Sequence, residues 1–207
     1  MDTKKQHLVK VELIALRPTQ MTVGFTEVQA KKATWEHLKH QEKKDFLDDH
    51  WFPGVLGPKE HYYIIDHHHL GMALLEEGVE HTHLILLKDF SQLDSDEFWT
   101  VMEHHQWLHL YDAQGKRCDI SALPKKIDQL SNDPYRSLAS TVRHGGGFVK
   151  DTTPFAEFLW ADFFRRRIKL AMLAKQPEVA LQTALTLAHS PSAAHLPGWS
   201  EQSHNGF

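Results

Sequence analysis

The spacing of apolar residues in the first half of the chain predicts alternating strands and helices. Residues 7–16 alternate apolar and polar side chains, which is typical of a half-buried strand. Residues 27–49 lack Gly and Pro and place apolar side chains at helical spacing, which predicts a long or broken helix. Residues 51–61 hold two Pro and two Gly and are expected to be a loop. Further strands are expected at residues 62–65, 82–90 and 108–118, and further helices at residues 67–77 and from Asp94 or Ser95 onward.

The second half of the chain predicts helices almost throughout. They are expected at residues 122–131, 133–144, 153–175 and 177–190. Thr153 followed by Pro154 is a typical helix start. Asp162 and Arg166 fall inside an apolar face of the 153–175 helix, so we expect them to pair with each other or with a site. This helix has two opposite apolar faces, which predicts a central position: Phe155, Leu159, Phe163 and Leu170 form one, and Trp160, Phe164, Ile168 and Ala171 the other.

These patterns predict an α/β (α+β) fold. We expect a small mixed-sheet domain over residues 1–120, a helical extension over residues 121–189 packed on it, and an extended tail over residues 190–207.

Composition narrows the classes of protein. The content of 41% hydrophobic and 24% charged residues over 207 positions is that of a globular protein, and no stretch reaches the ~20 apolar residues needed to span a bilayer. Cys118 is the single cysteine, so an intramolecular disulfide is excluded and the cytoplasm is the expected location. The net charge of −4 disfavours, without excluding, a nucleic-acid partner.

The most distinctive chemistry lies in the run Asp66-His67-His68-His69, between a predicted strand and a predicted helix. Amide groups at a helix start lack intrahelical partners and face the positive end of the helix dipole, which favours an anion site. A metal site is the alternative, and it would need further ligands from Asp66, from the pair His81 and His83, or from His104 and His105. A solvated helix start without a ligand is the third interpretation. Consecutive helical positions diverge by about 100°, so the three rings cannot all face one ligand.

Several segments resemble one family. The segment YIIDHHHLGMAL resembles the motif of the ParB/sulfiredoxin superfamily, which in many members reads Asp-Gly-His-His-Arg between a strand and a helix. LRPTQMTVGFTEVQAKK, PFAEFLWADFFRRR and LAHSPSAAHLPGW resemble the other segments of its ParB-like nuclease branch. The resemblance spans most of the chain. It implies a compact α/β fold whose motif helix holds phosphates, with relatives that include partition proteins, sulfiredoxins, nucleases and free-serine kinases.

The resemblance also nominates site residues. Glu27 matches the placement of the acid proposed as general base in the serine kinases. Two positions depart from the motif, because His67 stands where the family usually has Gly, and Leu70 where it usually has Arg. Loss of that Arg removes a phosphate clamp, which Arg17, Lys31 or an arginine of 165–167 would have to replace. The catalytic candidates are therefore Glu27, Asp66, His68 and His69, and the ligand-binding candidates are Arg17, Thr22, Gly24, Lys31, His67 and Arg166; His68 and His69 are also the metal candidates.

Three functions stay open at this point. The first is phosphoryl transfer to or from a small molecule, with a nucleoside triphosphate or diphosphate and a divalent metal as the implied cofactors. The second is a metal-dependent nuclease. The third is a binding module without catalysis, in which the site only holds a small-molecule or nucleotide ligand.

Overall fold

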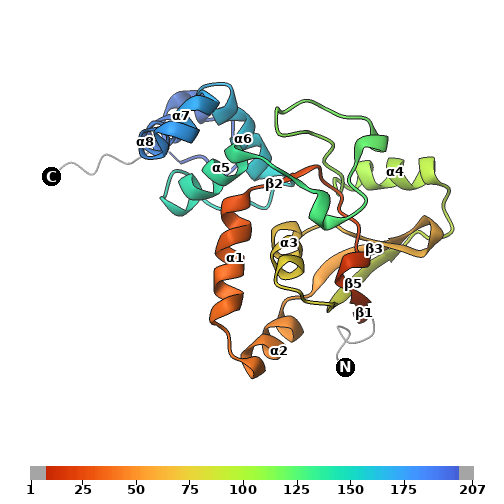
Figure 1. Ribbon diagram of the computed structural model, residues 1–207. Coiled ribbons are helices and arrows are strands. Elements are labelled where there is room, and N and C mark those ends of the chain that lie inside the picture. Colours follow the sequence, from red (N-terminus) through yellow and green to blue (C-terminus); the bar gives the residue numbers. More distant parts are fainter. Residues whose placement is uncertain (1–7, 201–207) are drawn as a thin grey trace. The chain divides into compact units, whose positions relative to one another are not determined.

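Four strands form one mixed sheet in the computed structural model, which describes residues 8–200 (Figure 1). Their order is β1-β5-β3-β4, where β5 pairs antiparallel with β1 and parallel with β3, and β3 pairs antiparallel with β4. A second, two-stranded sheet pairs β2 in parallel with β6. The strands are β1 (Leu8–Glu12), β2 (Thr22–Val23), β3 (Phe52–Gly57), β4 (His61–Ile64), β5 (His81–Asp89) and β6 (Ser131–Asn132).

Strand β3 corrects the prediction of a loop at residues 51–61. A Cβ atom on Gly54 would lie 2.6 Å from the carbonyl oxygen of Tyr63 and 2.8 Å from Leu84 Cδ1. Gly54 is therefore required by the close approach of the neighbouring strands, and it does not end the strand. The Gly- and Pro-rich composition here marks an irregular inner strand, with a register shift between Gly54 and Val55.

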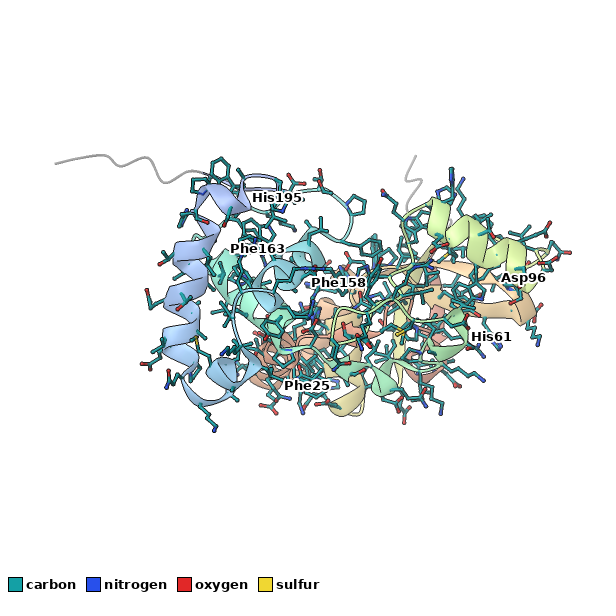
Figure 2. The ribbon with its side chains drawn as sticks, turned by 90° about the horizontal axis from the view of Figure 1, so that it is seen from above. Phe25, His61, Asp96, Phe158, Phe163 and His195 are labelled. Carbon is teal, nitrogen blue, oxygen red and sulfur yellow. The ribbon has the colours of Figure 1, made fainter. Side chains whose placement is uncertain are left out.

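Four α-helices accompany the sheet: α1 (Phe25–His37), α2 (His40–Asp49), α3 (His68–Glu76) and α4 (Ser95–His104). The helix predicted over residues 27–49 is the broken one, because the chain is extended at Leu38 and Lys39. Helix α4 begins as predicted, since the Asp94 carboxylate accepts the backbone N–H groups of Asp96 (labelled in Figure 2) and Glu97. The strand expected at residues 108–118 is instead a bridged turn, in which Tyr111 pairs with Arg117.

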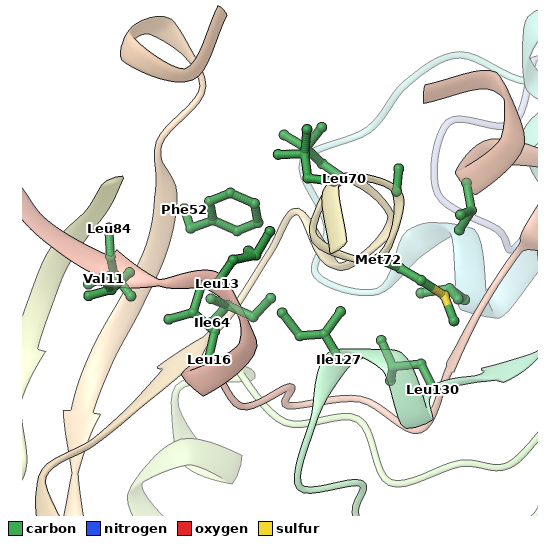
Figure 3. Packing of buried hydrophobic residues seen from close by; sticks show 14 of the residues in the cluster. Val11, Leu13, Leu16, Phe52, Ile64, Leu70, Met72, Leu84, Ile127 and Leu130 are labelled. Carbon is green, nitrogen blue, oxygen red and sulfur yellow. The ribbon is translucent and has the colours of Figure 1, made fainter. Parts of the chain in front are cut away.

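The two faces of the sheet bury different cores. On one face, Phe52 and Ile64 pack with Leu13, Leu16, Leu70 and Ile127 (Figure 3). On the other, Val55 and Tyr63 pack with Phe98 and Met102. Successive residues of a strand point to opposite faces, which is how neighbours such as Tyr63 and Ile64 serve separate cores.

The described residues separate into two compact units. The first contains residues 8–112 and 116–132, and the second contains residues 113–115 and 133–200. The first unit thus continues beyond residue 120, because Ile127 and Leu130 are buried in its core. The helix predicted at residues 122–131 is wrong and is replaced by the short 3₁₀ turns Ile120–Ala122 and Ile127–Gln129. Leu123 is extended (φ −61°, ψ 127°), which is the conformation favoured before a proline.

The second unit consists of helices α5 (Pro134–His144), α6 (Ala156–Arg165), α7 (Leu170–Lys175) and α8 (Pro177–Ala188). The single helix predicted over residues 153–175 is therefore two helices. Helix α6 starts after Phe155, which has φ 59°, and not after Thr153. Between α6 and α7, the Ile168 carbonyl accepts a hydrogen bond from the Tyr135 hydroxyl (2.6 Å), and Lys169 is extended. Within residues 8–200, none of the helices is long and apolar enough to cross a bilayer.

The two predicted apolar faces differ in burial. Trp160 and Phe164 of one face are fully buried. Of the other face, Phe163 is 4% exposed, whereas Leu159 and, in α7, Leu170 are 46% and 55% exposed. Asp162 and Arg166 do pair as predicted, with Arg166 Nε donating to Asp162 Oδ2 at 2.8 Å. Both side chains reach solvent, so the ion pair is not buried in the core as the apolar-face pattern implied.

Residues 190–200, which the sequence pattern assigned to an extended tail, pack within the second unit. Ala193 lies in the 3₁₀ turn Pro191–Ala193 and is buried, and so is Leu196. The Trp160 indole Nε1 donates to the Pro197 carbonyl (2.8 Å). Residues 201–207 of the predicted tail lie outside the described range.

We expect Leu196→Ala to lower the free energy of unfolding by about 2–4 kcal/mol, because it opens a cavity in the core of the second unit. Leu170→Ala, which truncates the same side chain at an exposed position, is expected to change it by less than about 0.5 kcal/mol. Urea unfolding of both variants measures the difference. Equal effects would show that residues 190–200 do not contribute to this core.

Candidate functional site

The Asp66–His69 segment is the turn that connects β4 to α3. The Asp66 Oδ1 accepts the backbone N–H of His67 at 2.6 Å. His67 has φ 65° and ψ 21°, in the left-handed region, and precedes the helix as its N-cap residue. His68 and His69 are thus the first two residues of α3, whereas the sequence pattern had placed all three histidines in the first turn.

His68 holds a loop of the first unit against this turn. Its side chain is buried, and Nε2 accepts the backbone N–H of Thr19 at 3.1 Å. The Thr19 hydroxyl in turn donates to the Ile64 carbonyl (2.9 Å) at the end of β4. An imidazole nitrogen that accepts an N–H carries no proton, so His68 is neutral and has its proton on Nδ1.

His69 joins α3 to the start of α1. Its Nε2 accepts the backbone N–H of Gly24, the N-cap residue of α1, at 3.0 Å. The Glu27 Oε2 lies 3.8 Å from the same nitrogen. Helices α1 and α3 lie side by side (Figure 1), and these contacts bring their first turns together.

The start of α1 depends on a group that is distant in the sequence. Neither Gly24 nor His67 provides a side-chain cap to its helix. The Asn132 side chain, from β6, accepts the backbone N–H of Phe25 at 3.1 Å. Asn132 could not be predicted as part of this site, because nothing in its local sequence marks it. Only the pairing of β2 with β6 brings it to α1.

The His67 imidazole is half-buried and meets the edge of the Phe52 ring, with centroids 5.9 Å apart. Burial lowers its pKa from the ordinary value of 6.5, and the positive charge of Lys31 lowers it further, against the opposing charge of Asp66. The neutral imidazole is therefore the favoured form at this position. Lys31, from α1, places a cation beside the turn.

The position of the motif arginine is part of the core. Leu70 is 3% exposed and belongs to the same buried cluster as Phe52 and Ile127. Arg17, the first candidate to replace the arginine, directs its guanidinium elsewhere, because Nη2 donates to His61 Nε2 at 2.8 Å.

The two remaining candidates for this charge differ. Lys31 acts on His67, as its effect on the pKa shows. Arg166 belongs to the second unit, where it is paired with Asp162. Lys31 is thus the candidate cation that the structure associates with the turn.

Thr22 and Gly24 reach the site through their backbone positions. The Thr22 side chain is fully buried and its hydroxyl makes no hydrogen bond. Gly24 contributes the N–H group that His69 accepts. A ligand role for the Thr22 hydroxyl stays a prediction.

One of the histidine pairs considered for a metal, His81 and His83, has acidic neighbours of its own. His81 Nδ1 lies 4.0 Å from Glu80, and His83 Nδ1 lies 3.6 Å from Asp48. Within residues 8–200, no three His, Cys, Asp or Glu side chains are arranged to hold a metal ion. For His68 and His69 to coordinate a metal through Nε2, they would have to give up their bonds to backbone N–H groups.

Comparison with known proteins identifies the family to which the chain belongs. The family model described as Putative ParB-like nuclease matches residues 9–166, which is most of the chain. The chain therefore belongs to this ParB-like family, as the motif resemblance predicted. No curated protein matches the sequence.

A solved structure extends the likeness over nearly the whole chain. The crystal structure of protein Atu1540 from Agrobacterium tumefaciens is 46% identical, with a TM-score of 0.89. The match covers 94% of this chain and 96% of that protein. The name of that protein states no activity.

The left-handed backbone at His67 gives a physical reason for the glycine that the ParB/sulfiredoxin motif usually carries there. Glycine adopts positive φ without steric cost, whereas a residue with a Cβ is disfavoured by roughly 1–2 kcal/mol. This chain keeps an imidazole in spite of that cost.

We therefore expect His67→Gly to be more stable than His67→Ala by about 1 kcal/mol, since both lose the imidazole and Ala alone retains the strain. Gln29, exposed within α1, provides the matched control. There Gly is expected to be less stable than Ala by about 0.5–1 kcal/mol. Thermal unfolding of the four variants tests this, and the same order at both positions would contradict a left-handed His67.

Proposed function

We propose that the joined first turns of α1 and α3 bind a phosphate-bearing small molecule, and that the protein catalyses phosphoryl transfer with Glu27 as general base. The observation that carries the proposal is the hydrogen bond from Gly24 N–H to His69 Nε2, together with Glu27 at 3.8 Å from the same nitrogen. It brings two helix starts and one carboxylate to a single place.

The arrangement suits an anion whose charge changes during a reaction. Each helix start carries a partial positive charge, and phosphates bind at such positions. Lys31 adds a full positive charge beside His67. Together these groups supply charge that the motif arginine, replaced by the buried Leu70, cannot supply in this chain.

Glu27 is the group suited to proton transfer. A carboxylate at this place accepts the proton of a substrate hydroxyl as the phosphoryl group arrives. His69 is a positioning residue, because its Nε2 is engaged with Gly24 and fixes the start of α1 beside Glu27. Mg²⁺ would balance phosphate charge if a nucleotide brings it, and the carboxylate of Asp66 is an oxygen ligand of the kind it takes alongside phosphates.

The proposal is tested by thermal unfolding with ATP, ADP and CTP, each with and without Mg²⁺. At a concentration about 100 times Kd, a ligand stabilises the folded state by about 2.7 kcal/mol. For a chain of this size, that corresponds to a rise in Tm of about 5–10 °C. Lys31→Gln is expected to weaken the effect. Lys32→Gln is the matched control, because Lys32 lies next to Lys31 in α1 but is paired with Glu76 and Glu77 at the end of α3.

Catalysis is tested separately from binding with Glu27→Gln, which keeps the shape of the side chain. This variant is expected to retain nucleotide-dependent stabilisation and to lose at least about 100-fold in nucleotide turnover with added hydroxyl acceptors. Stabilisation without turnover in the wild type would leave a binding module. Metal-dependent cleavage of DNA or RNA, without nucleotide binding, would favour the nuclease that the family name describes.

A further inference from the structure

The Arg17 guanidinium is bound to a histidine and not to a carboxylate. Nη2 donates to His61 Nε2 at 2.8 Å, and a guanidinium can only donate, so this nitrogen of His61 accepts and the imidazole is neutral. The Arg17 Cζ lies 5.8 Å from the centre of the Tyr63 ring. Among residues 8–200, the hydrogen bonds and ion pairs of Arg17 include no Asp or Glu. Arg17 thus forms no ion pair with a carboxylate in this part of the chain.

Lys59 adds a second positive charge to the same place. It lies in the hairpin that joins β3 to β4, two residues before His61. Its charge and that of Arg17 both lower the pKa of His61, after the larger effect of burial. Glu60, the neighbouring acid, forms no ion pair within the described part of the chain. Lys59 and Glu60 both have φ 58°. Glycine or asparagine would fit these positions with less strain, so the lysine is kept at a conformational cost.

The cluster lies away from the histidine turn. His61 begins β4, and the Asp66–His69 turn follows the other end of that strand. Figure 2 shows His61 well separated from Phe25, which marks the start of α1. Tyr63 forms one wall of the cluster, and burial raises the pKa of its hydroxyl, which therefore stays protonated and able to donate.

We propose that Arg17, Lys59 and His61 form a second anion site, which binds a phosphate group at the β3–β4 hairpin. Two fixed cations without protein carboxylates neutralise a phosphate dianion, and the fork of Arg17 matches two of its oxygens. The anion replaces His61 as the acceptor for Arg17. His61 Nε2 then takes one proton from solvent and donates it in a hydrogen bond to a phosphate oxygen, so binding is coupled to proton uptake.

The test follows the His61 imidazole by ¹³C NMR of histidine-labelled protein at pH 7.5 while inorganic phosphate is added. The His61 signal is expected to move toward its protonated position and to saturate. Chloride at matched ionic strength is expected to leave it in place. His61→Gln assigns the signal, and the His67 signal reports on the other proposed site in the same samples.

Three variants make the test specific. Arg17→Gln is expected to weaken binding by about tenfold or more, since it removes charged hydrogen bonds. Lys59→Asn is expected to weaken it by about threefold while raising Tm, because asparagine tolerates the left-handed backbone, so that unfolding cannot explain the loss. Arg117→Gln, at an arginine already paired with Glu103, is expected to have no effect.

A His61 signal that responds equally to phosphate and chloride would overturn the second site, as would unchanged binding in Arg17→Gln. Movement of His67 without His61 would overturn it as well and leave the proposed function standing. Movement of His61 without His67 would support the hairpin site and count against a phosphate at the turn.

Discussion

Two imidazole nitrogens that accept backbone N–H groups hold the candidate site together. His68 and His69 are consecutive helical residues, so their rings diverge by about 100°. They therefore reach two different points of one segment, Thr19 and Gly24. A buried N–H left without its acceptor costs about 1–3 kcal/mol, which makes both imidazoles structural requirements before any chemistry is considered. This gives the histidine pair of the motif a positioning role.

The positive charges near this site come from Arg17 and Lys31, which lie on different segments of the first unit. Arg17 lies just before the segment that His68 and His69 hold, and its backbone forms hydrogen bonds with Tyr62 and Ile64 of β4. Its guanidinium donates to His61 at the start of that strand. A cation whose charge lowers the pKa of His67 in the turn comes instead from α1, at Lys31, and the motif position of the arginine is filled by the buried Leu70. In the first unit, the motif position of the arginine thus contributes to core packing, and positive charge comes from residues outside the motif.

Much of the fold could be predicted from local pattern, because strand and helix periods and cap residues such as Asp94 act over a few residues. The inner strand β3 could not, since Gly54 is explained only by the strands on either side of it. The motif located the turn, whereas the 3.8 Å approach of Glu27 to His69 is known only from the structure. Asn132 and the direction of the Arg17 side chain depend on tertiary contacts that no local pattern carries.

The protonation of the two imidazoles tests this account most directly. Long-range ¹H–¹⁵N NMR of histidine-labelled protein, near neutral pH, distinguishes a protonated Nδ1 from a protonated Nε2. The bonds from Thr19 and Gly24 require His68 and His69 to carry their proton on Nδ1 and to leave Nε2 bare. That tautomer at both residues is the predicted result. A proton on Nε2 of either histidine would contradict the hydrogen bonds on which the site is built.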